Sequence, residues 1–264
     1  MAAVGGPRVC PAYPEEYLKM WQFLWGDHFL SPGGPEEVRR LTEGRGVGGM
    51  KVLDVGCGLG GSAAFLVQEM NVYSLVGIDF QEKLVSMASK WAAEIGLGDI
   101  AEFRHVDSLA WPFPDDAFDV VFVKDLLFHT DDALYDEIFR VLKPGGRLIL
   151  ADWFGTDRAR TRTFSTWLER NAFAKVSMTL GGIVDACILS GFSQVEVEDR
   201  SDRFVETFRE DAEKLRGETG KQFEGEVGAE VVRQLLSSWV EPCAALSKQG
   251  QLRAGTIYAT KPSV

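Results

Sequence analysis

A short glycine-rich segment and two acidic residues are the part of the sequence that most plainly suggests chemistry. Four glycines lie between residues 56 and 61, directly after an apolar run. At Gly56 and Gly58 the backbone can turn tightly and approach a ligand without side chains in the way. Asp79 ends the next apolar run, at a place where a carboxylate can accept hydrogen bonds from ribose hydroxyls. Together these features predict a nucleoside-containing cofactor.

The glycine spacing allows two cofactors. Gly56-x-Gly58-x-x-Gly61 satisfies the dinucleotide fingerprint, so an NAD-dependent oxidoreductase is one alternative. Asp54 stands two residues before the first glycine, and its negative charge opposes a pyrophosphate. S-adenosyl-L-methionine carries an ammonium and a sulfonium and no phosphate, so Asp54 favours this cofactor. A glycine loop that holds no ligand is the structural alternative.

Alternating strands and helices are expected to position these residues. Apolar segments at 50–55, 74–79, 101–106, 118–123 and 147–151 predict strands, and further strands are expected at 194–198 and 255–260. Helical patterns at 62–70, 81–95 and 132–142 follow the first, second and fourth of these segments. We therefore expect an α/β fold, with a Rossmann-like, doubly wound, mostly parallel seven-stranded sheet. Residues 1–45 would form an N-terminal helical cap, residues 46–152 the cofactor-binding core, and residues 153–264 an inserted lid, the C-terminal helices and the final strands.

Composition excludes several classes of protein. Hydrophobic residues make up 45% and charged residues 25% of the chain, which is typical of globular proteins. A net charge of −11 argues against a nucleic-acid partner. No apolar run is long enough for a membrane span, and the start of the chain lacks the apolar region of a signal peptide. The four cysteines form no Cys-x-x-Cys pair, so we expect no metal site, no disulfide framework and a cytoplasmic location.

The ordered motifs resemble those of the class I S-adenosylmethionine-dependent methyltransferases. They are 54–60, 77–79, Asp107, 118–121 and 142–146. The resemblance implies that Asp54 and the glycine backbone face the methionine part, that Asp79 holds the ribose, and that Asp107 with Ser108 lies near the adenine. The alternative for Asp107 is a turn or helix cap.

Segments outside the core resemble the phosphoethanolamine N-methyltransferases and the related sarcosine/dimethylglycine N-methyltransferases. They are 21–34, 123–129, 198–204 and 255–261. Further contacts to the cofactor are expected from the cap and the strand ends: Trp21, Ser31, Phe80 and Lys124.

The same resemblance implies a catalytic pair, Tyr13 and His129, which removes a proton and closes the site. Methyl transfer to nitrogen needs a lone pair, and an amine with a pKa near that of lysine is almost wholly protonated at pH 7. Histidine has a suitable pKa to accept the proton, although a single histidine after a strand is often structural. Asp125 would attract the ammonium, unless it is simply paired with Lys124.

One departure from this group concerns the acceptor. Phosphate-binding members use tyrosine hydroxyls and basic side chains where this chain has Trp153, Trp167 and Phe173, with Arg170 and Lys175 nearby. Tryptophan suits a methylated ammonium through cation–π attraction, and lid packing is the alternative. We therefore expect Trp153 and its neighbours, not a basic pocket, to select the acceptor.

These observations predict transfer of a methyl group from S-adenosyl-L-methionine to a small soluble amine that resembles phosphoethanolamine, sarcosine or dimethylglycine. The alternatives are an O- or C-methyltransferase for a small apolar acceptor and a non-catalytic protein that binds the same cofactor. We expect a monomer or a weak homodimer, with no metal ion.

Overall fold

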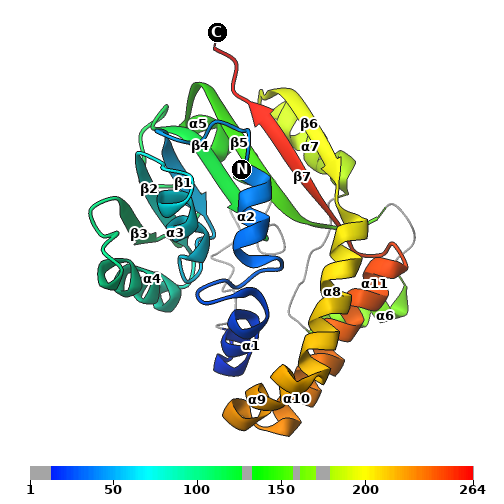
Figure 1. Ribbon diagram of the computed structural model, residues 1–264. Coiled ribbons are helices and arrows are strands. Elements are labelled where there is room, and N and C mark those ends of the chain that lie inside the picture. The colour runs from blue at the N-terminus through cyan, green and yellow to red at the C-terminus, as the bar shows by residue number, and fades with distance from the viewer. Residues whose placement is uncertain (1–12, 127–132, 157–160, 171–178, 264) are drawn as a thin grey trace.

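A seven-stranded sheet forms the centre of the protein, in a computed structural model that describes residues 13–126, 133–156, 161–170 and 179–263 (Figure 1). The strands are β1 (Lys51–Val55), β2 (Ser74–Asp79), β3 (Ala101–His105), β4 (Phe118–Lys124), β5 (Leu142–Phe154), β6 (Ser193–Asp199) and β7 (Arg253–Thr260). Their order in the sheet is β3-β2-β1-β4-β5-β7-β6. Strands β1 to β5 pair in parallel, and β7 is antiparallel to both β5 and β6. The expected mostly parallel seven-stranded α/β fold is confirmed.

Helices cover the sheet and extend beyond one end of it (Figure 1). They are α1 (Glu15–Trp25), α2 (Gly34–Thr42), α3 (Gly61–Gln68), α4 (Glu82–Glu94), α5 (Ala133–Val141), α6 (Arg162–Arg170), α7 (Leu180–Leu189), α8 (Ser201–Arg216), α9 (Glu218–Val227), α10 (Ala229–Leu235), the π-helix η2 (Leu236–Val240) and α11 (Glu241–Lys248). None of the helices in the described part of the chain combines the length and apolar character of a membrane span.

Successive residues of the central strands supply two separate cores. Val52 and Phe122 belong to the core that contains α1 to α4, whereas Leu53 and Val121 belong to the core that contains α5 and α7. All four side chains are almost completely buried. Burial on both faces explains why β4 is nearly all apolar instead of alternating with polar residues.

The topology places the ends of β1, β2 and β4 together. From β1 the chain proceeds to β2 and β3 on one side, and it returns to place β4 on the other side of β1. Loops that follow neighbouring strands diverge at this point, which leaves a crevice at the carboxyl ends of the strands. The glycine segment follows β1, Asp79 ends β2, and Lys124 ends β4.

The third part of the chain differs from the sequence-based expectation at Trp153. This residue was expected in a lid, but β5 continues to Phe154, and Trp153 pairs with Ala254 of β7 inside the sheet. Its indole ring lies 4.8 Å from the Phe204 ring and 5.9 Å from the Trp239 ring. The pairing with β7 holds the strand extended beyond the segment 147–151 that the sequence predicted.

Candidate active site

A cleft of about 800 Å³ opens at the carboxyl ends of β1, β2 and β4. It is lined by many of the residues expected from the sequence: Tyr13, Ser31, Asp54, Gly56, Gly58, Asp79, Phe80, Lys124 and Asp125. The residues come from the cap, from the glycine segment and from the ends of three strands. The fold therefore assembles one site from positions that are more than a hundred residues apart in the chain. We call this space the donor cleft, because the sequence predicts that these residues bind the methyl donor.

The glycine segment fits closely against the cap and the end of β4. Gly56 has a φ of 81°, and a Cβ there would lie 2.9 Å from the Leu126 side chain. At Gly61, a Cβ would lie 2.6 Å from the His28 carbonyl oxygen, to which the Gly61 N–H donates a hydrogen bond of 3.2 Å. A side chain at either position would push the loop away from its neighbours. The glycines thus serve the contact with the cap as well as access to the cleft.

Asp54 is a buried acid that faces the donor cleft. Its side chain is 2% exposed, and its Oδ2 atom has no hydrogen-bond partner among the described residues. Burial and the nearby Asp79 carboxylate raise the pKa of Asp54 to about 7, against the opposing effect of Lys124. An unsatisfied buried carboxylate oxygen is costly, so this atom suits a ligand that brings a cation or a strong donor.

Two backbone N–H groups hold the Asp79 carboxylate, one from the loop after β1 and one from the residue that precedes α4. Gly58 donates to one carboxylate oxygen at 3.0 Å, and Gln81 donates to the other at 2.9 Å. Burial raises the pKa of Asp79, and these N–H groups partly oppose that shift. Each oxygen retains a further lone pair, so the carboxylate is fixed in orientation and can still accept from a ligand hydroxyl.

Lys124 and Asp125 join the cap to the end of β4. The Lys124 Nζ atom donates to Ser31 Oγ at 2.5 Å, to Pro32 O at 3.0 Å and to Asp125 Oδ2 at 2.6 Å. The alternative that the sequence left open, a pair between Asp125 and Lys124, is therefore present. Asp125 also has a positive φ of 56°, which is uncommon for a residue other than glycine and turns the chain sharply at the cleft.

A second pocket, of about 400 Å³, shares Lys124 and Asp125 with the donor cleft. Trp153 lines one side of it, and Arg200 and Arg203 line another. Trp153 was expected from the sequence to select the acceptor, whereas neither arginine was expected at this site. Arg200 and Arg203 lie three residues apart on one face at the start of α8, a spacing that was visible in the sequence. The wall of this pocket therefore contains basic as well as aromatic side chains, and the selection of the acceptor by the aromatic ones stays a prediction.

Comparison with known proteins decides between the two cofactors that the glycine spacing allowed. Residues 52–146, which contain the glycine segment and the strands β1 to β4, match a family model described as a methyltransferase domain. Residues 52–146 of the chain thus carry a methyltransferase domain, which favours the cofactor that Asp54 also favours.

Relatives of known sequence are similar over most of this chain. Phosphoethanolamine N-methyltransferase 1 of Arabidopsis thaliana is 30% identical over 241 residues, which are 88% of this chain and 48% of that protein. The sterol 24-C-methyltransferase ERG6A of Gibberella zeae is 32% identical over 206 residues, 70% of this chain and 53% of that protein. The chain thus spans about half the length of the curated relatives it matches.

Solved structures share the fold of the methyltransferase domain and its helical additions. Phosphoethanolamine N-methyltransferase 2 of Haemonchus contortus, in complex with phosphomonomethylethanolamine and S-adenosylhomocysteine, superimposes with a TM-score of 0.86 at 22% identity. The match covers 93% of this chain and 57% of that one. A Galdieria sulphuraria protein assigned as a sarcosine dimethylglycine methyltransferase gives 0.80 at 19% identity, over 95% and 98% of the two chains.

The residues of the donor cleft fit S-adenosylmethionine. The unpartnered, buried Oδ2 of Asp54 suits the ammonium of the methionine part, and the fixed carboxylate of Asp79 suits the ribose hydroxyls. Tyr13 also lines the cleft, with its ring 4.9 Å from the ring of Trp21. Trp21 itself is not among the lining residues and belongs to the buried aromatic packing of the cap.

A small apolar chamber of about 220 Å³ continues from the donor cleft. The two share Gly56, Asp79, Phe80 and Leu126, and the chamber is lined further by Leu109 and Trp111. Asp107 and Ser108, which the family resemblance assigned to the adenine, are not among its lining residues. Trp111 was not expected at the site from the sequence, because it lies in a Pro-rich loop without a periodic pattern.

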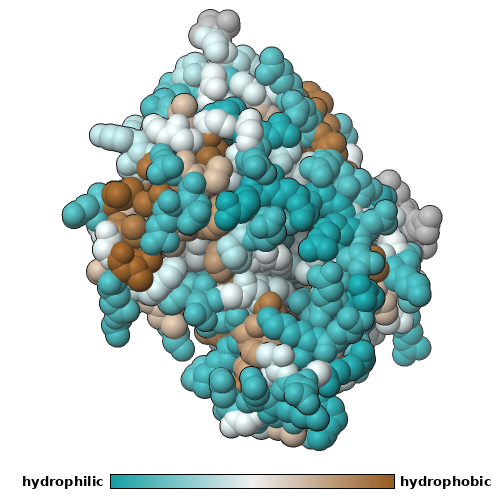
Figure 2. Space-filling view, in the orientation of Figure 1, coloured by the Kyte–Doolittle hydropathy of each residue, from teal (hydrophilic) through white to brown (hydrophobic). Residues whose placement is uncertain are grey.

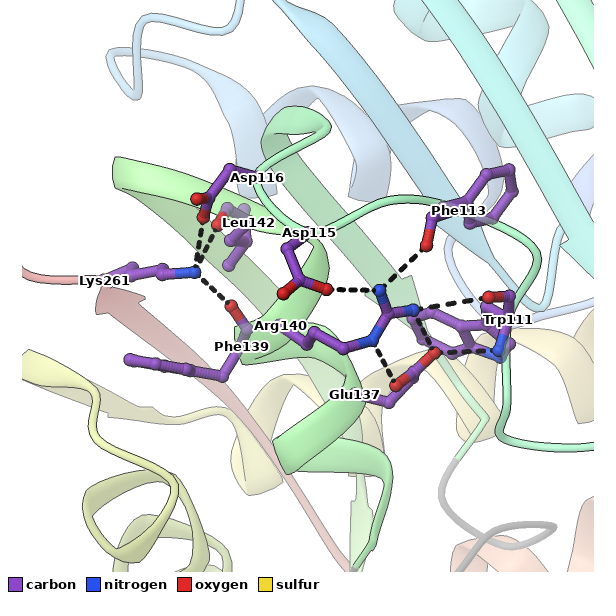
Figure 3. Close-up of polar contacts among 9 residues, drawn as sticks. All are labelled: Trp111, Phe113, Asp115, Asp116, Glu137, Phe139, Arg140, Leu142 and Lys261. Atoms are coloured by element: carbon purple, nitrogen blue, oxygen red, sulfur yellow. Dashed lines mark hydrogen bonds and ion pairs between the residues drawn. The ribbon is translucent and has the colours of Figure 1, made fainter.

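A polar network fixes the loop that carries Trp111 (Figure 3). Glu137 accepts a 2.8 Å hydrogen bond from the backbone N–H of Trp111, and Arg140 donates to the Trp111 carbonyl at 3.3 Å. Arg140 also donates to the Phe113 carbonyl and to Asp115, each at 2.8 Å. Both Glu137 and Arg140 belong to α5. The helix therefore sets the position of the chamber wall.

Some expected residues lie outside the described part of the chain. His129, the proposed base, is one of them, so its pairing with Tyr13 stays a prediction. Phe173 and Lys175 also lie outside it. Within the described residues, no group of three or more His, Cys, Asp or Glu side chains is arranged to hold a metal ion.

Proposed function

We propose that this protein transfers a methyl group from S-adenosylmethionine to the nitrogen of a small amine that resembles phosphoethanolamine, sarcosine or dimethylglycine. The observation that carries the proposal is the junction of two pockets at Asp125. One pocket holds the acids expected to bind the donor, and the other, which has both charged and aromatic side chains in its wall, lies beside it. An amine bound in the second pocket would lie next to the methyl donor, beside the carboxylate of Asp125.

The donor side of the proposal rests on residues whose environment is fixed before any ligand binds. When bound, S-adenosylmethionine would supply an electrophilic methyl group on its sulfonium. Asp54 would bind its ammonium, Asp79 would accept from its ribose, and Phe80 with Trp111 would enclose its adenine. Asp79→Ala should weaken donor binding more than tenfold by calorimetry, because two hydrogen bonds to a charged group are lost. Unchanged binding would contradict this assignment.

The acceptor side needs removal of a proton. Asp125 would attract and orient the ammonium of the acceptor, although its charge is shared with Lys124 at 2.6 Å. His129 would take the proton as general base, and Tyr13 would hydrogen-bond the imidazole and hold the cap closed. Close placement of the nitrogen and the methyl group would provide much of the remaining rate enhancement.

The test is turnover with a donor that carries a labelled methyl group and a panel of amines. The panel should contain phosphoethanolamine, sarcosine, dimethylglycine and neutral amino alcohols, each analysed by mass spectrometry. Transfer to the nitrogen of at least one of them is the expected result. Donor binding without transfer to any acceptor would leave a non-catalytic cofactor-binding protein. A cytoplasmic location, a monomer or weak homodimer, and no nucleic-acid partner are further proposals from the sequence.

C-methylation of an apolar acceptor is the second candidate. Two observations favour it: the similarity to a sterol 24-C-methyltransferase, and the aromatic side chains beside the second pocket. Phe204 lines this pocket with Trp153, and Phe208 packs 5.6 Å behind Trp153. The charged residues of the pocket argue against it, because burying them against an apolar acceptor without partners is costly. A labelled product with the methyl group on carbon would establish this function instead.

A further inference from the structure

The second pocket contains two arginines that the function proposed above does not use. Six charged residues line it: Glu37, Lys124, Asp125, Asp152, Arg200 and Arg203. Lys124 is paired with Asp125 at 2.6 Å, and Arg200 is paired with Glu37. The side chains of both pairs are largely buried, so their charges are neutralised inside the wall.

Arg203 differs from the other cations of the pocket. Its side chain is 47% exposed, and its one ion pair within the described chain is to Glu210, at 3.6 Å. That separation exceeds a normal hydrogen bond, so most of its N–H donors are available to a ligand. A planar guanidinium with free donors is the group best suited to a carboxylate or phosphate, which it can bind through two parallel hydrogen bonds.

Arg200, Phe204 and Trp153 line the same pocket as Arg203. Arg200 stands one helical turn earlier, donates to Thr256 Oγ1 at 3.4 Å, and is anchored to Glu37 of α2. Phe204 and Trp153 lie in contact, with ring centroids 4.8 Å apart, and form an apolar side of the pocket. Figure 2 shows mostly hydrophilic residues over α2 and the start of α8, the two helices that this ion pair joins.

We propose that Arg203 binds an anionic group of the acceptor, with the acceptor's carbon chain against Trp153 and Phe204 and its amine toward Asp125. The proposal rests on the methyltransferase function proposed above. It makes Arg203 a specificity-determining residue that distinguishes anionic amines from neutral ones. A carboxylate and a phosphate present the same chemistry to a guanidinium, and the two sources are separated by the acceptors used in the test.

The test compares Arg203→Gln and Arg203→Lys with the unchanged protein on matched acceptors. One acceptor carries a carboxylate, one a phosphate, and one a neutral hydroxyl on a chain of the same length. Arg203→Gln should raise KM for the anionic acceptor at least about tenfold, with kcat little changed, because a charge-assisted pair is lost. Arg203→Lys should recover part of the loss. KM for the neutral amine should not change.

A matched control is available on the same helix. Arg209 of α8 is exposed, pairs with Glu206 and Glu213 at 2.7 Å each, and lies outside the pocket. Arg209→Gln removes the same charge from α8 and should leave every KM unchanged. An equal rise in KM for anionic and neutral acceptors in Arg203→Gln, or no rise for either, would overturn the proposal.

Equilibrium binding separates this inference from the function on which it rests. Calorimetry with protein loaded with S-adenosylhomocysteine, which has no methyl group to transfer, measures binding of sarcosine and phosphoethanolamine without turnover. Binding that is lost in Arg203→Gln, with no methyl transfer, would support the anion site and reject the methyltransferase function. Methyl transfer to amines regardless of their charge, unaffected in Arg203→Gln, would reject the anion site alone. No binding of either anionic amine to the unchanged protein would also reject it.

Discussion

Two carboxylates in one cleft, the buried Asp54 and the half-buried Asp79, set the properties of the site at the scale of single residues. Asp79 is stabilised by two backbone N–H groups, whereas Asp54 has an oxygen without a partner. The protein itself thus fixes the carboxylate of Asp79, whereas the ionised form of Asp54 depends on a bound ligand for a partner. A cationic ligand would restore to Asp54 the solvation that folding removes.

Donor binding is therefore expected to depend on pH. The pKa of Asp54 is raised to about 7, so the acid is largely protonated below that pH in the unliganded protein. A cationic donor favours the ionised form, so donor affinity should rise roughly tenfold between pH 5.5 and pH 7. This range lies below the titration of the donor's own amino group, near pH 8. Calorimetry in buffers of equal ionic strength measures it.

Asp54→Asn is the matching variant, because the amide keeps the shape and cannot ionise. It should bind the donor more weakly than the unchanged protein at pH 7, and its affinity should be almost independent of pH. The sign is opposite for the unliganded fold. A raised pKa means that the stability contribution of Asp54 is lost as pH rises through about 7. Donor affinity that is flat with pH in the unchanged protein would contradict this account.

The proposed pair of Tyr13 and His129 gives the second prediction at this scale. His129→Ala should lower kcat by about 10²–10⁴, the usual contribution of a general base, and should change donor affinity much less. Tyr13→Phe should cost less, because a hydrogen bond is lost while the base is retained. The double variant should lose less than the two losses combined, because residues that act as a unit are not additive. A near-normal kcat in His129→Ala at neutral pH would make the histidine structural.

At the scale of elements, α5 holds the loop between β3 and β4, whose position could not be predicted from the sequence. Arg140 donates to the carbonyls of Trp111 and Phe113, and Lys261 of the C-terminal segment donates to Asp116, Phe139 O and Leu142 O (Figure 3). The two cations hold adjacent parts of the same loop. Only the part held by Arg140 carries a wall of the apolar chamber.

Because only Arg140 holds the part of the loop that lines the apolar chamber, replacing Arg140 and replacing Lys261 should have different effects on donor binding. Arg140→Met and Lys261→Met should each lower the free energy of unfolding by about 1–3 kcal/mol, because each leaves buried carbonyls with fewer donors. Arg140→Met should also weaken donor binding, whereas Lys261→Met should not. Denaturant unfolding and donor calorimetry on both variants measure the two effects. Equal losses of donor affinity would show that the chamber wall depends only on general stability.

The sequence predicted these elements where a local pattern repeats and missed positions that depend on distant partners. The alternation of strands and helices predicted the sheet, and the spacing of Gly56, Asp79 and Asp54 predicted the donor cleft. Trp153 was misplaced because the strand that extends β5 across it is β7, about a hundred residues later. Arg200 was missed because its partner Glu37 lies on α2. Such pairings follow from packing of the whole fold, not from local periodicity.

At the scale of the whole molecule, α1 of the cap is bonded to α8 beyond the sheet. The Trp25 indole donates to Asp211 at 2.9 Å, and Lys214 donates to the carbonyls of Phe23 and Leu24. The residues that form these bonds are almost two hundred positions apart. Tyr13, which lines the donor cleft, precedes α1, and Arg203, which lines the second pocket, belongs to α8. The contact between α1 and α8 therefore connects the chain segments that carry these two residues.

The buried acid in that contact makes stability depend on pH. Burial raises the pKa of Asp211 to about 7, against the hydrogen bond from Trp25 and the charge of Lys214, and with Glu210 adding to the rise. The neighbouring Cys243 thiol is also buried. A raised pKa contributes stability at acidic pH that is lost as pH rises through about 7.

Asp211→Asn should therefore be more stable than the unchanged protein at pH 8, by at least about 1.4 kcal/mol, which corresponds to one pKa unit. The amide can still accept from Trp25, and it carries no charge to desolvate. Thermal or denaturant unfolding at pH 5 and pH 8 measures the difference, which should be much smaller at pH 5. A constant difference at the two pH values would show that Asp211 does not titrate in this range.

Transfer of a labelled methyl group from S-adenosylmethionine to a small amine is the measurement that tests the central claim most directly. The purified protein is incubated with the labelled donor and an equimolar mixture of anionic and neutral amines, and the products are identified by mass spectrometry. The account predicts one or more methyl groups on nitrogen, with anionic amines consumed first, and much less product from Asp79→Ala at the same limiting donor concentration. Label on carbon, or no transfer to any amine while the donor binds normally, would contradict it.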